Sequence, residues 1–204
     1  MLIKINPENP QMRLINQVVD CLKGGGVIVY PTDTTYGLGC DIFNRKGIKK
    51  IYQIKQRDAR KPFSFICNDL AEVSNYAQVS NYAFKIMKRH LPGKYTFVLD
   101  ATRVVPDALI TKQKTVGIRI PDNPIVHEIV RQLGHPLVTT SANLSGEETP
   151  QDPQEIYEEM GRVVDMVIDG GILMAEGSSV ISLLNDQAEI LRHGSGDTAW
   201  LAEV

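Results

Sequence analysis

The sequence VIVYPTDTTYGLG, residues 27–39, joins an apolar run to a polar loop. Val27–Tyr30 is short, apolar and rich in β-branched residues, so it predicts a strand buried on both faces. The loop that follows, Pro31–Gly39, carries three threonine hydroxyls, a carboxylate and a phenol. Ligands of open α/β sheets bind just beyond strand ends, which makes this a candidate binding loop. An ordinary turn, whose hydroxyls satisfy nearby backbone groups, is the alternative.

Strand and helix patterns alternate on both sides of this stretch. Upstream, residues 2–5 alternate like a strand, and a helical pattern after Pro10 ends at Gly24–Gly25–Gly26. That glycine run predicts a turn, because phosphate loops follow a strand and open a helix. Downstream, we expect helices over residues 48–55, 80–90 and 124–133 and from residue 153, and strands over 63–67, 95–99, 115–119, 137–140, 166–169, 179–183 and 188–192. The class is therefore α/β: one twisted, open, mixed sheet flanked by helices, in a single domain over residues 1–204.

Composition supports a globular protein of the cytoplasm. Hydrophobic residues make up 43% of the chain and charged residues 23%, and 204 residues suit one large domain. Apolar runs stay well short of the roughly 20 residues that cross a bilayer, and the first residues lack the pattern of a signal peptide, so we expect no membrane partner. Three distant cysteines (Cys21, Cys40 and Cys67) fit small buried residues better than a disulfide framework or a zinc site.

Charge is unevenly distributed along the chain. The net charge of −2 weighs against a protein that depends on nonspecific nucleic-acid binding. Residues 45–61, however, hold eight basic residues and one acid, whereas residues 147–176 hold nine acids and one base. The basic segment is suited to meet an anion, and a solvated basic helix end is the alternative.

Two groups of residues at strand and helix ends suggest a phosphate site. Lys55, Arg57 and Lys61 lie where a helix ends before a strand, and Ser141–Ala142–Asn143 directly follows an apolar strand. Two such ends can share one crevice, where cations and small polar groups would meet a triphosphate. The chain has no Walker sequence, and Ser141 lacks the glycine pattern of a hydrolase nucleophile. Its four histidines show neither metal spacing nor an obvious nucleophile partner.

Two arginines occur in or at the end of predicted strands. Arg119 lies inside the run VGIRIP, where an unpaired guanidinium would be costly, so it must contact either a ligand anion or a carboxylate of the protein. Arg192, in the run ILRHG, raises the same two alternatives.

Six motifs, in this order, resemble those of the YrdC-like threonylcarbamoyl-AMP synthase family, and within it the YciO subgroup: PTDTTYGLG (31–39), KQR…KP (55–62), PGKYTFVL (92–99), VGIRIP (116–121), TTSAN (139–143) and ILRHG (190–194). The resemblance covers about residues 10–195. It implies a twisted open sheet with a large, positively charged concave cavity. It also implies condensation of L-threonine, bicarbonate and ATP to threonylcarbamoyl-AMP and pyrophosphate, the step that precedes t6A modification beside the tRNA anticodon.

The resemblance implies a role for each matching residue. Lys55 and Arg57 would be catalytic and, with Lys61, would neutralise the phosphates and the threonine carboxylate. Ser141 and Asn143 would hydrogen-bond the phosphates, and Arg192 would hold the nucleotide. The threonine pocket would be lined by Thr32, Thr35, Tyr36 and Arg119. Mg²⁺ would be bound through ATP phosphate oxygens, with no metal site of the protein itself.

Some positions favour the YciO branch of this family. Pro92–Gly93–Lys94 stands where synthases usually carry Pro-Gly-Pro, although the Ser-Ala-Asn triplet is complete. Two alternatives to synthesis therefore stay open: a paralogue that binds tRNA or double-stranded RNA on the concave surface, and one that acts on threonylcarbamoyl compounds. Other enzymes of the t6A pathway are further expected partners.

Overall fold

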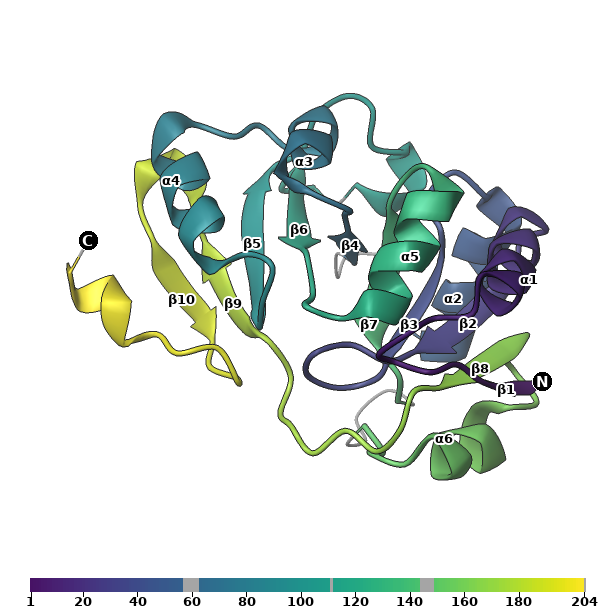
Figure 1. The fold of residues 1–204 in the computed structure, drawn as a ribbon. Coiled ribbons are helices and arrows are strands. Elements are labelled where there is room, and N and C mark those ends of the chain that lie inside the picture. The colour runs from purple at the N-terminus through teal and green to yellow at the C-terminus, as the bar shows by residue number, and fades with distance from the viewer. Residues whose placement is uncertain (57–62, 111, 144–148, 204) are drawn as a thin grey trace.

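A ten-stranded mixed sheet forms the centre of the protein in the computed structural model, which describes residues 1–56, 63–110, 112–143 and 149–203 (Figure 1). The strand order is β1-β8-β2-β3-β7-β4-β6-β5-β9-β10. The strands are β1 (Leu2–Lys4), β2 (Val27–Tyr30), β3 (Gly37–Asp41), β4 (Ser64–Ile66), β5 (Tyr95–Asp100), β6 (Thr115–Arg119), β7 (Leu137–Ser141), β8 (Met166–Asp169), β9 (Ser179–Ser182) and β10 (Glu189–Arg192). The predicted class, an open mixed α/β sheet, is confirmed.

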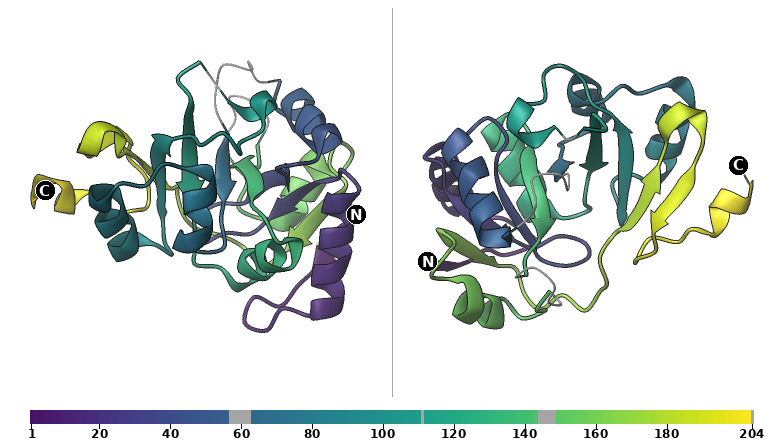
Figure 2. Two further views of the ribbon diagram at one scale, coloured as in Figure 1. Left: turned by 90° about the horizontal axis from the view of Figure 1, so that it is seen from above. Right: turned by 180° about the vertical axis from the view of Figure 1, so that it is seen from behind.

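Six α-helices flank the sheet in the described part of the chain. They are α1 (Met12–Lys23), α2 (Arg45–Lys55), α3 (Leu70–Tyr76), α4 (Asn81–His90), α5 (Pro124–Leu133) and α6 (Pro153–Met160). Three short 3₁₀ turns occur at Asp107–Leu109, Leu184–Asp186 and Ala199–Glu203. Two further views show how strongly the sheet twists between its ends (Figure 2). None of the described helices is long and apolar enough to span a membrane.

The alternation of side chains along the strands separates the core from the site. Val138, Phe65, Ile118 and Phe97 lie side by side on β7, β4, β6 and β5. All four are buried, in the hydrophobic cluster to which α2, α3, α4 and α6 contribute. The neighbouring row, displaced by one residue along each strand, faces the opposite side of the sheet.

That opposite side is apolar near α1 and α5 and polar farther along the strands. Leu137 and Ile66 pair across β7 and β4 and belong to the cluster that includes α1 and α5. Two residues farther along the same face, Thr139 pairs with Ser64. Hydroxyl side chains thus replace apolar ones where the helices no longer cover the strands.

Strand β3 was not expected, because two glycines in five residues weigh against a strand. The position of β3 in the sheet, however, requires glycine at residues 37 and 39. A Cβ atom at Gly37 would lie 2.8 Å from the Tyr30 ring, and one at Gly39 would lie 2.6 Å from the Val138 carbonyl oxygen. The Tyr30 ring crosses β3 in this space, and its hydroxyl donates a hydrogen bond to Thr139 Oγ1 at 2.5 Å.

Several local predictions are confirmed. The Ser80 hydroxyl accepts the Ala83 N–H at the start of α4, and residues 24–26 form a turn after α1. Cys40 and Cys67 are buried, whereas Cys21 is only partly so. Helix α3 was missed, since seven residues show little periodicity; the Asp69 side chain caps it by accepting the Glu72 N–H.

We predict that Gly39→Ala lowers the free energy of unfolding by about 1–3 kcal/mol, because the added methyl group meets a backbone carbonyl that cannot move without breaking the sheet. Urea unfolding followed by circular dichroism measures the change. Gly24→Ala is the matched control, since its methyl group would find only ordinary contacts at 3.4 Å. Equal unfolding midpoints for the two variants would contradict the assigned role of Gly39.

Candidate functional site

A cavity of about 960 Å³ opens on the polar side of the sheet. Its floor is formed largely by hydroxyl side chains from four adjacent strands: Ser64, Thr96, Thr115 and Thr139. Residues 170–178, which connect β8 to β9 across the length of the sheet, contribute Glu176 and Ser178 to its wall (Figure 1). A floor of small hydroxyl groups can hydrogen-bond a polar ligand without filling the space.

Lys55 joins the end of α2 to the residues that end and follow β7. The side chain is buried, with the residue only 5% exposed, and Nζ donates hydrogen bonds to the Ser141 carbonyl at 3.1 Å and to the Asn143 carbonyl at 2.7 Å. Nζ also contacts Asn143 Oδ1 at 2.7 Å, to which the Ser141 hydroxyl donates at 2.5 Å. The structure therefore brings Lys55, Ser141 and Asn143 together. The end of α2 and the end of β7 meet, as the sequence predicts.

The other two cations of this motif, Arg57 and Lys61, lie outside the described residues. Helix α2 ends immediately before them, because Gln56 adopts the left-handed conformation with φ 43°. Their assignment to the phosphates stays a prediction.

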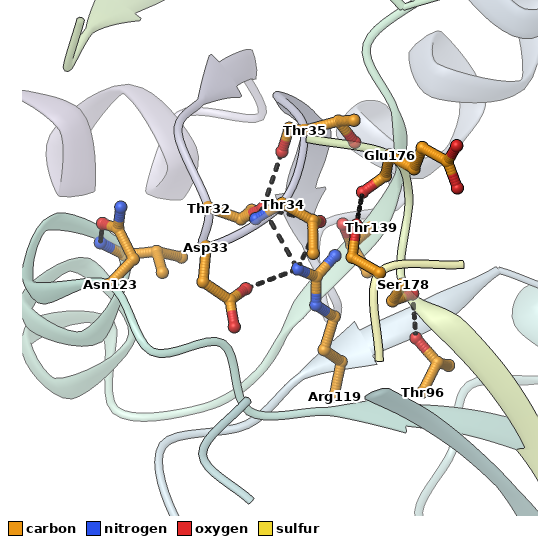
Figure 3. A network of polar contacts seen from close by, with 12 residues as sticks. Thr32, Asp33, Thr34, Thr35, Thr96, Arg119, Asn123, Thr139, Glu176 and Ser178 are labelled. Carbon is orange, nitrogen blue, oxygen red and sulfur yellow. Dashed lines mark hydrogen bonds and ion pairs between the residues drawn. The ribbon is translucent and has the colours of Figure 1, made fainter. Parts of the chain in front are cut away.

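Arg119, at the end of β6, is enclosed by the loop that follows β2 (Figure 3). Its Nη2 atom contacts Asp33 Oδ1 at 2.6 Å, Thr34 Oγ1 at 2.7 Å and Thr32 Oγ1 at 3.1 Å. The Thr32 hydroxyl donates to the Thr35 carbonyl at 2.6 Å. A carboxylate of the protein is thus the partner of Arg119, and the polar loop is folded around a buried positive charge.

The ion pair leaves two polar atoms unused. Arg119 Nε and Asp33 Oδ2 are buried and have no hydrogen-bond partner among the described residues. One is a donor and the other an acceptor, and Arg119 itself lines the cavity. Asp33 was not among the site residues expected from sequence; the only signal was its place in a hydroxyl-rich loop after a buried strand.

The Tyr36 phenol is bonded to the backbone of residues 170–171 rather than pointing freely into the cavity. The residue is fully buried, and its hydroxyl donates to the Gly171 carbonyl at 2.7 Å and accepts the Gly170 N–H at 3.1 Å. Burial raises the pKa of Tyr36 to about 12, so the phenol is neutral at physiological pH. The phenol thereby attaches residues 170–171 to the binding loop. Thr35 and Tyr36 both border the cavity, whereas the Thr32 side chain is used within the Arg119 network.

Arg192 faces the cavity from the opposite wall. Its Nη2 atom donates to the Ser178 carbonyl at 2.7 Å, and the Ser178 and Thr96 hydroxyls are 2.8 Å apart. Burial, and then repulsion from Arg119, lowers the pKa of the Arg192 guanidinium, which nevertheless stays protonated because arginine begins above 12. Arg192 thus brings a positive charge to the cavity that Arg119, paired with Asp33, also lines, and Glu176 is an acidic group on the same cavity.

Fold and site together define an α/β protein with a hydroxyl-floored cavity lined by two arginines, beside which Lys55 is bonded to Ser141 and Asn143. Comparison with known proteins places it more narrowly. Residues 20–194 match the family Sua5_yciO_yrdC, described as "Telomere recombination". The chain belongs to this Sua5, YciO and YrdC family.

Two relatives show where the chain stands in the family. It is 45% identical over 195 residues to the uncharacterized protein YciO of Escherichia coli strain K12, covering 95% of both chains. A crystal structure of E. coli YciO superposes with a TM-score of 0.93 and covers 98% of both chains. A putative threonylcarbamoyl-AMP synthase of Methanocaldococcus jannaschii is 37% identical over 198 residues, covering 95% of this chain and 92% of its own.

A more distant structure contains a ligand. Sua5 of P. abyssi, crystallised in complex with L-threonine, superposes with a TM-score of 0.89 at 27% identity. The match covers 95% of this chain and 57% of that one.

We predict strong coupling between Asp33 and Arg119. Asp33→Asn should lower the free energy of unfolding by about 3 kcal/mol or more, because it leaves a buried guanidinium without its counterion. Arg119→Met removes the charge, so the double variant should lose less stability than the sum of the two single changes. Urea unfolding of all four proteins gives the coupling energy. Additive losses would show that the ion pair does not hold the loop.

The Tyr36 phenol should make stability depend on alkaline pH. Its pKa in the folded protein lies above the ordinary value of 10, so its contribution is complete below pH 10 and is lost as the pH rises toward 12. The unfolding free energy of the wild type should fall by about 2 kcal/mol more than that of Tyr36→Phe across this interval. Parallel pH curves for the two proteins would contradict the assignment; the other tyrosines, present in both, cancel.

Proposed function

We propose that this protein is an L-threonylcarbamoyladenylate synthase that supplies the precursor for t6A modification of tRNA. The observation that carries the proposal is the hydrogen-bonded group of Lys55, Ser141 and Asn143, of which Ser141 lines the cavity that Arg119 and Arg192 also line. A putative synthase that is 37% identical over nearly the whole chain supports the same reading.

The reaction needs positioning and charge stabilisation rather than a protein nucleophile. The amine of threonine adds to bicarbonate with loss of water, and an oxygen of the resulting carbamate attacks the α-phosphorus of ATP. The bond from that phosphorus to the bridging oxygen breaks, and pyrophosphate leaves. Cations that face the developing negative charge, and donors that orient the phosphates, supply the catalysis.

Each residue then has an assigned task. Lys55, with Arg57 and Lys61, neutralises the triphosphate, and the Ser141 hydroxyl and Asn143 amide orient it. Arg192 holds the nucleotide from the opposite wall. Thr35, the backbone around Tyr36 and the Thr32–Arg119 network form the end that takes threonine. Mg²⁺ enters with ATP and is bound through phosphate oxygens.

The network around Arg119 gives the threonine end a fixed shape. The ion pair with Asp33 and the contacts to the Thr32 and Thr34 hydroxyls hold Arg119 in place at the cavity wall before a ligand arrives, so binding there needs little reorganisation.

A second candidate follows from the 45% identity to YciO and from Lys94 in the position of the synthase proline. A paralogue of this branch would act on threonylcarbamoyl compounds with little synthase activity, or would bind tRNA or double-stranded RNA on the concave surface around the cavity. RNA affinity of that kind falls steeply with salt concentration.

Pyrophosphate release from threonine, bicarbonate and Mg·ATP tests the first proposal. We expect threonine-dependent release by the wild type and a loss of about 100-fold or more in Lys55→Met, because a charge that faces the transferring phosphate is removed. Lys46→Met, a change of an exposed lysine on the same helix, is the control and should keep full activity.

The synthase proposal is wrong if pyrophosphate release by the wild type does not depend on threonine. Hydrolysis of added threonylcarbamoyl-AMP, or salt-sensitive binding of double-stranded RNA in a filter assay, would then support the second candidate function.

A further inference from the structure

A second hollow of about 730 Å³ lies between the first two turns of α2 and the connection from β5 to β6. It shares no lining residue with the candidate active-site cavity in the described part of the chain. No step of the proposed reaction uses this hollow, so a role for it is independent of the proposed function.

The interior of this hollow is apolar. Ile48 and Val105 are buried at its base, whereas Phe43 and Val104 keep 47% and 53% of their surface exposed. The Phe43 ring is held edge-on by the His135 ring, with centroids 5.0 Å apart, so it stays at the opening. Large exposed apolar side chains gathered in a concavity are typical of a site covered by another molecule.

The walls are fixed by a contact between helix and loop. The Tyr52 hydroxyl of α2 donates a hydrogen bond to the Ala108 carbonyl at 3.2 Å. The Tyr52 ring also packs edge-on against Phe63, with centroids 4.8 Å apart. The hollow is therefore part of the folded structure rather than a gap between independent segments.

Three exposed cations surround the apolar interior: Arg45 and Lys49, one turn apart on α2, and Arg103 on the facing loop. Within the described residues, none of the three forms an ion pair or a side-chain hydrogen bond. Lys50, on another face of the same helix, is instead paired with Asp165 at 2.6 Å. Among the described residues that line the hollow, Asp107 is the single acid.

This arrangement divides the basic run that the sequence presents as one segment. Lys55 reaches the active-site group and Lys50 a surface carboxylate, while Arg45 and Lys49 turn to the second hollow. Helical periodicity causes the division, because residues four apart share a face and residues five or six apart do not. The positive charges of Arg45 and Lys49 are therefore not explained by an ATP site.

We propose that the second hollow binds an acidic peptide segment of a partner protein, with an apolar side chain of the segment seated over Ile48 and Val105. Carboxylates beside this anchor meet Arg45, Lys49 and Arg103. An apolar centre with a charged rim is the arrangement of a protein-binding hot spot, and complementary charge selects the partner.

The lining favours a peptide over RNA. A site for single-stranded nucleic acid typically offers several aromatic faces on which successive bases stack. Here Phe43 is the exposed ring, and the Tyr52 hydroxyl already bonds a carbonyl of the protein. The remaining walls are aliphatic and include Pro106 and Ala108.

Fluorescence polarisation with a fluorescein-labelled peptide, in which a central Leu-Phe pair is flanked on both sides by Asp and Glu, tests the proposal. The wild type should bind it, and Arg45→Glu/Lys49→Glu should weaken binding about tenfold or more through like-charge repulsion. Val104→Asp should weaken it similarly. These side chains are exposed, and matching thermal unfolding of each variant confirms that it folds.

The matched control is Lys85→Glu/Arg89→Glu, which reverses two exposed charges at the same spacing on α4 and should leave the affinity unchanged. Equal losses in the two double variants would reduce the effect to net charge and overturn the proposal. Failure of the wild type to bind the peptide would also overturn the proposal. Binding of a labelled single-stranded RNA, lost in Arg45→Glu/Lys49→Glu while the peptide stays unbound, would assign the hollow to nucleic acid instead.

Discussion

The ion pair between Arg119 and Asp33 is the constraint on which the site depends. A guanidinium at the end of an inner strand cannot stay buried without a counterion, and its carboxylate comes from the loop after β2. Three strands separate β2 from β6, so at about 4.8 Å per strand the loop must bridge nearly 20 Å. The loop reaches across because its threonines, as well as Asp33, bond to one guanidinium nitrogen. This bridging brings the loop beside the hydroxyl floor, where Thr35 and Tyr36 line the cavity.

Much of the fold could be predicted because its signals are local. The apolar run of β2 and the Asn123 cap with Pro124 at the start of α5 each identify an element within a few residues. Strand β3 could not be found in this way. Its glycines contradict strand propensity and make sense only once the Tyr30 ring is known to cross them.

The site was partly predictable for the same reason. Lys55, Ser141 and Asn143 come together because each lies at or just beyond the end of an element, where the sequence also places it. The partner of Arg119 could not be chosen from sequence, since the choice between ligand and carboxylate depends on strand order. Likewise, the Tyr36 phenol bonds to residues more than 130 positions away, which no local pattern encodes.

Strand order also has a consequence for biosynthesis. The strand at one end of the sheet, β1, pairs only with β8, and at the other end β5 pairs with β9, so residues beyond 165 complete both ends. While the ribosome is still making that segment, β1 and one edge of β5 have no partner, and the unfinished sheet presents open edges to other chains. Contacts between residues so distant in sequence also slow folding. The nascent chain therefore depends on residues 166–204, about a fifth of the sequence, to cover the open edges of β1 and β5.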